Sequence, residues 1–286
     1  MSAPNSDPPS AQADGTITLE LLDGVAVLTI RRQGRRNALH MPLWQQLGDR
    51  LDEVAPHCAP DGPIRALVLT GSGGHFCAGM DLKPDNPLVQ RILPAIMEAD
   101  RDAARGVILE LKAITRKLLD LPVPTLAAIE GVAAGGGYEV ALHCDVLIAT
   151  EEASVGLPEV RWGMVPDVGG TTLLARRIGR GRATLAVTTG RMFPAVQALT
   201  LGMVDLLCPP GQALDHARAA ARDVGRGGPQ AVSGALSALR RGLDLPLQDA
   251  FALETEAGVA ALISGEPREG TMAFAEKRDP DWGRPA

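Results

Sequence analysis

The sequence predicts an α/β fold in which a largely buried sheet is followed by a helical C-terminal region. Short apolar runs, each long enough for one strand, alternate with helical patterns through most of the chain. Two of these runs lead into glycine-rich loops. After Pro209-Pro210, three helical patterns follow one another without a strand between them. This order is typical of an α/β protein with a largely buried sheet and an appended group of helices.

The expected strands are apolar runs bounded by turn residues. The first two runs are joined at Asp23-Gly24, a strong signal for a hairpin. Later runs are short and continuous, as in strands that are covered on both faces. We expect strands at residues 17–22, 25–30, 66–70, 125–129 and 145–149.

The expected helices show apolar residues every three or four positions. They lie at residues 41–54, 93–121, 138–144, 212–226, 230–241 and 247–263. The long second pattern contains Gly106, where we expect an interruption, and Pro122 stops it. The segments at residues 72–87 and 131–137 are expected to be loops.

The composition indicates a folded globular protein. The chain has 286 residues, of which 45% are hydrophobic, and its net charge of −6 argues against a general nucleic-acid binder. Arg31, Arg32, Arg35 and Arg36 nevertheless form a local basic cluster. This cluster is either a solvated loop or a site for the phosphates of a ligand.

The cysteines and the chain termini bear on location. The four cysteines show neither CxxC spacing nor a metal-ligand pattern with the five histidines, so we expect free thiols in the reducing cytoplasm. No apolar run reaches the ~18 to 20 residues of a membrane span.

We expect a disordered tail at residues 1–15, a core at 16–208 that contains the active site, and a helical region at 209–286.

Two glycine-rich loops carry the chemical signal. The first reads GHFCAGMDLK over residues 74–83, and the second reads GVAAGGGYE over residues 131–139. Neither is a P-loop or a dinucleotide fingerprint. Glycine lets the backbone approach a ligand closely, and the free N–H groups at a helix start carry partial positive charge. Two such loops that face each other can form an oxyanion hole, although each alone predicts only a tight turn.

Other motifs stand at fixed places around these loops. They are Asn37-Ala38-Leu39, Leu157-Pro158-Glu159 and residues 269–277. Together with the loops, over residues 16–282, they resemble the crotonase (enoyl-CoA hydratase/isomerase) superfamily. The resemblance implies a spiral of ββα turns, C-terminal helices used in trimer contacts, and hexamers built as dimers of trimers. It also implies an acyl-CoA thioester substrate and no metal or redox cofactor.

The resemblance further implies which residues form the site. By position, the N–H groups of Met80 and Gly136 would be the oxyanion-hole donors. Ala38 would lie near the coenzyme A nucleotide, and Lys277 would approach its phosphates. The coenzyme A and substrate set would be Ala38, Ala78, Met80, Asp81, Leu82, Lys83, Gly136 and Lys277.

Glu139 and Glu159 match the catalytic glutamates of the hydratase pattern. Adding water across a conjugated thioester needs a base to activate water and an acid to protonate the α-carbon, and two carboxyl groups can share these tasks. Without the resemblance, Glu139 would complement a helix dipole and Glu159 would be a solvated loop charge. With it, the pair predicts a 2-enoyl-CoA hydratase.

Asp167 leaves alternatives open. Hydratases usually have a small residue at this position, whereas some enoyl-CoA and dienoyl-CoA isomerases place a proton-transferring Asp there and aryl-CoA dehalogenases a nucleophilic one. A helix N-cap before Thr171 is an equally good interpretation. The hypotheses are therefore a hydratase, an isomerase that uses Asp167, and, in another class, a non-catalytic acyl-CoA-binding protein.

Overall fold

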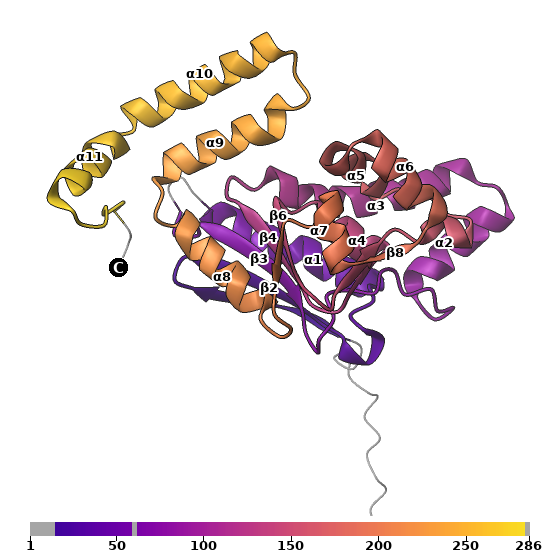
Figure 1. Cartoon of the computed structure of the whole chain (residues 1–286). Coiled ribbons are helices and arrows are strands. Elements are labelled where there is room, and N and C mark those ends of the chain that lie inside the picture. Colours follow the sequence, from indigo (N-terminus) through magenta and orange to yellow (C-terminus); the bar gives the residue numbers. More distant parts are fainter. Residues whose placement is uncertain (1–14, 59–61, 284–286) are drawn as a thin grey trace, which may run out of the picture.

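A computed structural model describes residues 15–58 and 62–283 (Figure 1). The predicted tail lies outside these residues except for Gly15. Within them, a six-stranded sheet has the order β1-β2-β3-β4-β6-β9, and a three-stranded sheet has the order β5-β7-β8. The larger sheet contains β1 (Thr16–Leu22), β2 (Val25–Arg31), β3 (Ala66–Gly71), β4 (Thr125–Ile129), β6 (Val146–Thr150) and β9 (Leu206–Cys208). The smaller one contains β5 (Val132–Ala134), β7 (Ser154–Gly156) and β8 (Met192–Pro194).

The predicted hairpin and buried strands are confirmed. β1 and β2 pair antiparallel, and both turn residues have positive φ, 50° at Asp23 and 76° at Gly24, as a tight hairpin turn with the right twist requires. From β2 onward every neighbouring pair in the larger sheet is parallel. The carboxyl ends of β3 and β4 therefore lie side by side, and both glycine-rich loops leave from this edge.

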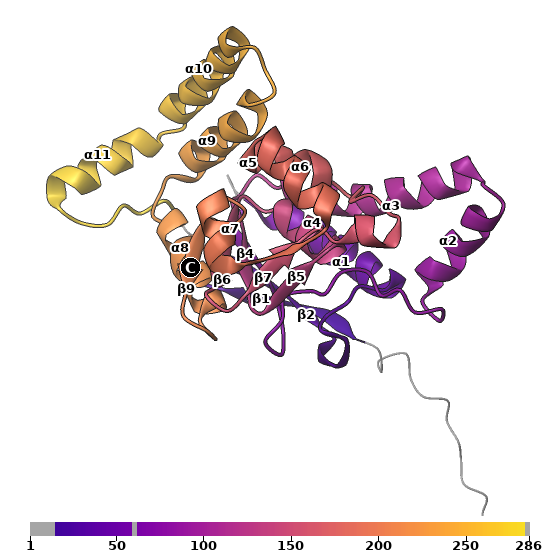
Figure 2. The same cartoon turned by 45° about the vertical axis from the view of Figure 1, so that its right-hand side comes forward.

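Helices surround the sheet (Figures 1 and 2). They are α1 (Met41–Val54), α2 (Pro87–Met97), α3 (Arg101–Asp120), α4 (Gly136–Leu142), α5 (Gly170–Ile178), α6 (Arg180–Thr189), α7 (Ala195–Leu201), α8 (Ala213–Val224), α9 (Pro229–Gly242), α10 (Leu247–Ile263) and α11 (Glu266–Glu276). None of the described helices is long and apolar enough to span a membrane. All four cysteines are buried free thiols, as predicted.

Both faces of the larger sheet are covered. Along β2, Ala26 and Leu28 belong to the main core with Trp44 of α1, whereas Val25 and Val27 belong to a second core beneath α8. This division follows from the alternation of side chains along a strand. It explains why the strand is a continuous apolar run with no polar face.

Two expectations about local structure were wrong. The predicted interruption at Gly106 does not occur, because the break falls between α2 and α3, where the Asp100 carboxylate caps α3 through the N–H groups of Asp102 and Ala103. The predicted loop at residues 131–137 contains β5, which pairs with β7. Further elements had no predicted counterpart: β7, β8, β9, α5, α6, α7 and α11.

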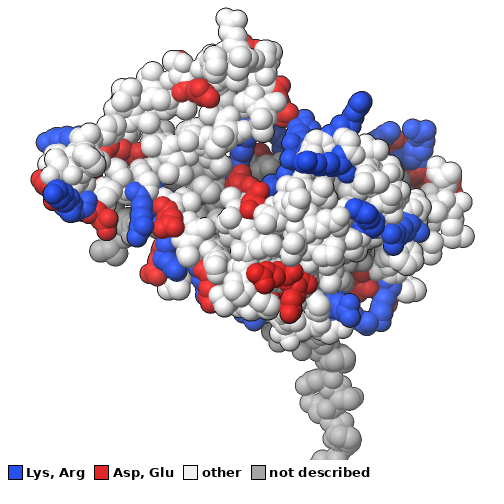
Figure 3. Space-filling view, in the orientation of Figure 1, with Lys and Arg blue, Asp and Glu red and all other residues white. Residues whose placement is uncertain are grey.

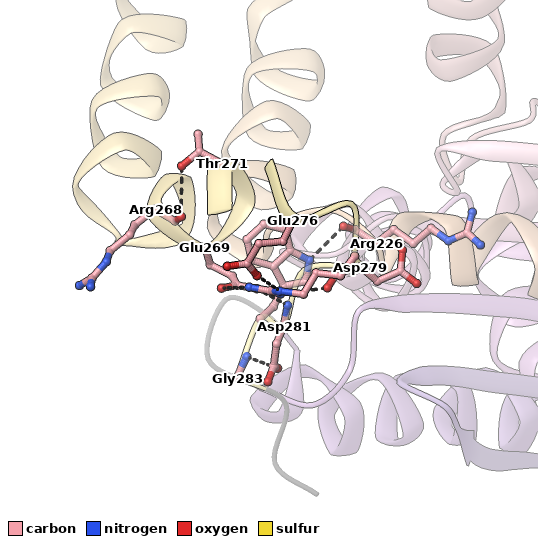
Figure 4. Close-up of polar contacts among 10 residues, drawn as sticks. Arg226, Arg268, Glu269, Thr271, Glu276, Asp279, Asp281 and Gly283 are labelled. Carbon is pink, nitrogen blue, oxygen red and sulfur yellow. Dashed lines mark hydrogen bonds and ion pairs between the residues drawn. The ribbon is translucent and has the colours of Figure 1, made fainter. Parts of the chain in front are cut away.

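The last three helices form an arm that extends away from the sheet (Figures 1 and 2). Arg240 of α9 anchors the arm, because its guanidinium donates to both carboxylate oxygens of Asp145 at 2.7 and 2.6 Å and to the carbonyls of Leu119 and Leu121. At the far end, the chain turns back and Asp281 N–H donates to Glu269 at 2.7 Å (Figure 4). Since α8 still packs on the sheet, the predicted division near residue 208 stays a prediction.

Candidate active site

The two glycine-rich loops meet backbone to backbone. Cys77 N–H donates to Val132 O at 3.0 Å, and Ala134 N–H donates back to Cys77 O at 3.0 Å. This ladder pins the first loop against β5. It brings Met80, farther along the first loop, close to Gly136 at the start of α4: a Cβ built on Gly136 would lie 3.7 Å from the Met80 nitrogen.

Within residues 15–58 and 62–283, the N–H groups of Met80 and Gly136 have no backbone acceptor. The residues on either side of Met80 both form backbone hydrogen bonds with Leu39: Leu39 N–H donates to Gly79 O, and Asp81 N–H donates to Leu39 O. The Met80 N–H takes no part in this pairing. Gly136 is the first residue of α4, where an N–H has no acceptor within the helix. Two adjacent free donors are what an oxyanion hole requires.

Glycine is required at two positions around these donors. Gly79 has φ +99°, and a Cβ there would lie 2.7 Å from Ala134 O. Gly135 has φ +51°, and a Cβ there would lie 3.1 Å from Oε1 of Glu159. Any larger residue would therefore separate the loops or displace a candidate catalytic carboxylate.

A buried ion pair supports the first loop. Arg32 follows β2, and its Nη1 lies 2.7 Å from Oδ2 of Asp81 and 2.9 Å from Ala38 O. Asn86 adds a bond from its side-chain amide to Asp81 O. Arg32 is thus turned inward, whereas Arg31, Arg35 and Arg36 of the predicted basic cluster are exposed. Sequence reasoning missed this role, because a cluster of arginines gives no sign of which one is buried.

Glu139 lies on the first turn of α4 and is only 3% exposed. Its Oε1 accepts the N–H groups of Val168 at 2.8 Å and Gly170 at 2.9 Å, so its carboxylate does more than complement a helix dipole. Burial raises the pKa of Glu139 to about 8; the nearby Glu159 carboxylate adds to this rise, and the amide bonds oppose it.

Glu159 begins a 3-10 turn, η4 (Glu159–Trp162), after β7. Both of its carboxylate oxygens are buried, and among the described residues neither has a hydrogen-bond partner. Burial raises its pKa to about 7, and the neighbouring Asp167 contributes to the rise. The interpretation as a solvated loop charge was therefore wrong. A buried carboxyl group with no partner is a candidate for proton exchange with a ligand.

Asp167 is half-buried in the turn before α5. It is not the helix N-cap, because that position belongs to Gly169 and no side chain caps the helix there. Burial raises the pKa of Asp167, although the charge of Lys112 on α3 opposes this. The charge of Asp167 also raises the pKa of both Glu139 and Glu159, so the structure brings all three predicted carboxylates into one site.

The remaining predicted residues fall into two groups. Ala38, Ala78, Leu82 and Lys83 lie beside Met80, on the first loop or the segment paired with it. Lys277 ends α11, which both views place at the outer end of the arm, far from α4 (Figures 1 and 2). The fold thus does not bring Lys277 to the site of its own chain.

Comparisons with known proteins identify the family of the chain. A family model described as enoyl-CoA hydratase/isomerase matches residues 20–285. The chain belongs to the enoyl-CoA hydratase/isomerase family. The resemblance to the crotonase superfamily is thereby confirmed, and so is the predicted fold class.

Relatives within the enoyl-CoA hydratase/isomerase family include more than one activity. The 2,3-dehydroadipyl-CoA hydratase of Escherichia coli is 34% identical over 258 residues, which are 90% of this chain and 94% of the relative. The enoyl-CoA isomerase/hydratase fer4 of Mycosarcoma maydis is 34% identical over 264 residues, 91% of this chain and 92% of the relative. The crystal structure of an enoyl-CoA hydratase from Bacillus anthracis superposes with a TM-score of 0.84 at 30% identity, covering 94% of this chain and 100% of that chain.

Proposed function

We propose that the protein is an enoyl-CoA hydratase that adds water across the 2,3 double bond of a 2-enoyl-CoA thioester. The observation that carries this proposal is that two carboxyl groups and two backbone donors converge: Oε1 of Glu159 faces Gly135, Glu139 lies on the first turn of α4, and the N–H of Gly136, which begins α4, stands beside that of Met80. Burial raises the pKa of both carboxyl groups toward neutrality. Each can therefore gain or lose a proton at the pH of a cell.

The backbone donors would stabilise the intermediate. When a nucleophile attacks the β-carbon, negative charge moves to the thioester oxygen and forms an enolate. Two N–H groups aimed at that oxygen lower the barrier, and one such donor is worth about 3 to 4 kcal/mol in the transition state. The ladder between Cys77 and β5 fixes both donors before the substrate arrives, so little reorganisation is needed.

The carboxyl groups would move the protons. Hydration transfers the water oxygen to the β-carbon, one water proton to a carboxylate, and one proton from a carboxyl group to the α-carbon. Since the two glutamates repel each other when both are ionised, the pair holds one proton over an intermediate pH range. A pair in this state supplies an acid and a base together, and each turnover restores it.

A test of hydration uses the simplest substrate. The purified protein is incubated with crotonyl-CoA, the loss of the conjugated-enoyl absorbance is followed, and the product is identified by mass spectrometry. Formation of 3-hydroxybutyryl-CoA is expected. Tight binding of acyl-CoA without turnover across a panel of chain lengths would contradict a hydratase and support the non-catalytic binding protein.

Asp167 supports a second candidate, an isomerase that moves a 3,4 double bond to the 2,3 position. Its carboxyl group is half-buried in the same site and does not cap α5, so it is available for proton transfer. With 3-hexenoyl-CoA, an isomerase would generate conjugated-enoyl absorbance. Loss of this activity in Asp167→Asn, with crotonyl-CoA hydration retained, would assign isomerisation to Asp167; an unchanged rate would exclude it.

The arm supports an assembly of three or six chains. Figure 3 shows few charged side chains over α9 and α10 on this face. Exposed apolar side chains along the arm are Leu239, Leu243, Leu247, Phe251, Val259, Leu262, Ile263, Met272 and Phe274. Because Lys277 is far from the site of its own chain, its predicted contact with the coenzyme A phosphates requires the site of another chain. Light scattering after size-exclusion chromatography tests this proposal, and a monomer at micromolar concentration would contradict it.

A further inference from the structure

A buried histidine lies between the backbone of Glu139 and the turn that binds the Glu139 carboxylate. His143 directly follows α4 and is 5% exposed. Its Nδ1 lies 2.8 Å from Glu139 O. Because a carbonyl oxygen can only accept, Nδ1 must carry the proton. Burial lowers the pKa of His143, so the ring is neutral with Nε2 unprotonated.

The Cε1–Nε2 edge of the ring faces the turn before α5. A Cβ built on Gly169 would lie 2.6 Å from Cε1 of His143 and 3.1 Å from Nε2. Gly169 has φ +110° and stands between Val168 and Gly170, whose N–H groups hold Oε1 of Glu139. The imidazole therefore fills the space between α4 and the clamp formed by these two amides.

We propose that His143 is a positioning residue for Glu139: it holds the 168–170 turn at the distance from α4 at which both amides bind the Glu139 carboxylate. This inference rests on the proposed proton-transfer role of Glu139. The ring acts by contact with backbone on both sides. A smaller side chain would leave a space into which the turn relaxes, and the two amide bonds would lengthen.

The first test measures the clamp without relying on activity. The variants are His143→Ala, which removes both contacts, and His143→Asn, whose amide can still donate to Glu139 O. Carbon-13 NMR titration of glutamate carboxyl groups, assigned by comparison with Glu139→Gln, reports the pKa of Glu139. Since the amide bonds lower this pKa, we expect His143→Ala to raise it by about half a pH unit. His143→Asn should give a smaller rise.

Kinetics supply the second measurement. We expect kcat/KM for crotonyl-CoA to fall about tenfold in His143→Ala, mainly through kcat, because misplacing a catalytic group affects chemistry more than binding. The limb of the pH profile that reports Glu139 should move to higher pH. Glu159 and Asp167 are the other titratable groups that raise the pKa of Glu139, and the substitution of His143 changes neither residue. Cys144→Ala, which truncates the next buried side chain, should lower Tm and leave the profile unchanged.

A double-mutant cycle tests the contact itself. Gly169→Ala introduces a Cβ that collides with the His143 ring, and this collision is absent in the double variant with His143→Ala. We expect the double variant to recover part of the loss in Tm and kcat/KM caused by Gly169→Ala. Strictly additive effects would contradict a contact between the two residues.

The outcomes separate this inference from the proposed function. If no enoyl-CoA is turned over, the hydratase proposal fails, but the NMR titration still reports whether His143 holds the clamp. If His143→Ala leaves both the Glu139 pKa and the pH profile unchanged while turnover persists, the positioning role is overturned and the hydratase proposal stands.

Discussion

Nη1 of Arg32 lies 2.7 Å from Oδ2 of Asp81, and both side chains are less than one-tenth exposed. This ion pair joins the end of the β1–β2 hairpin to the loop that carries the Met80 N–H. Burial raises the pKa of Asp81, but the hydrogen bonds from Arg32 and the Lys83 N–H, together with the charges of Arg32 and Arg35, outweigh this effect and hold the pKa below its ordinary value. Asp81 is therefore ionised at neutral pH.

Asp81→Asn should weaken both stability and turnover. It removes the carboxylate that lies 2.7 Å from the buried Arg32 guanidinium, and breaking a buried ion pair typically costs about 3 kcal/mol in free energy of unfolding. The loop that carries the Met80 N–H should become more mobile, and kcat/KM for crotonyl-CoA should fall about tenfold. Urea denaturation and steady-state kinetics measure the two effects. Glu110→Gln removes the exposed pair with Arg91 and should cost less than about 1 kcal/mol; an equal effect of both variants would contradict this account.

Gly136→Ala should impair turnover without unfolding the protein. Its Cβ would stand 3.6 Å from Trp44 and 3.7 Å from the Met80 nitrogen, which are ordinary contacts, so folding should be normal. The methyl group would crowd the thioester oxygen, and kcat should fall by at least about tenfold. Gly106→Ala is the control, because that exposed helix position has open space and should gain about 1 kcal/mol with full activity. Equal activity in both variants would place the oxyanion hole elsewhere.

The raised pKa values of Glu139 and Glu159 predict that stability falls as pH rises. Below the ordinary value of 4.5 both carboxyl groups are protonated in folded and unfolded chains. Between 4.5 and about 8, the folded protein retains protons that the unfolded chain has released, so unfolding becomes more favourable with increasing pH. In Glu159→Gln the loss of stability with rising pH should be smaller. The difference in Tm, variant minus wild type, should therefore increase from pH 5 to pH 8.5. A constant Tm difference across this range would show that the Glu159 pKa is ordinary.

Arg240→Ala should release the arm from the core. The side chain is 17% exposed and donates to Asp145 and to the carbonyls of Leu119 and Leu121, so its removal breaks a partly buried ion pair, although Thr125 still donates to the Asp145 carboxylate. We expect faster hydrogen exchange in α9 and a loss of about 3 kcal/mol in stability. Arg241→Ala, on the exposed side of the same helix, should have no such effect. Equal exchange rates in the two variants would contradict the anchoring role.

The sequence pattern predicted an element correctly where its apolar residues recur at a regular spacing. The helix at residues 41–54 was predicted with its observed bounds, since buried leucines recur every four residues from Leu43 to Leu51, Val54 follows three residues later, and Pro42 favours a helix start. The break before α3 was misplaced because Gly106 tolerates the helix, whereas Asp100 imposes a cap and Ala99 adopts φ +52°. β5 was missed because it is three residues long and owes its existence to pairing with the distant β7.

The site was only partly predictable for a similar reason. The resemblance located Glu139, Glu159, Met80 and Gly136, but the pattern around Asp167 suited an N-cap equally well. Only the three-dimensional structure shows that Gly169 occupies the cap and that Glu139 takes the flanking amides. The contact between His143 and Gly169 joins residues that are 26 positions apart, and no local sequence signal marks it.

The most direct test of the central claim compares crotonyl-CoA hydration by wild type, Glu139→Gln and Glu159→Gln. The account predicts hydration by the wild type and a fall in kcat of at least about a hundredfold in each variant, because each loses one proton-transfer group while keeping its shape. Unchanged circular dichroism and acyl-CoA affinity would show that the fold and binding site remain. Full turnover by either variant would contradict the roles assigned to the two carboxyl groups.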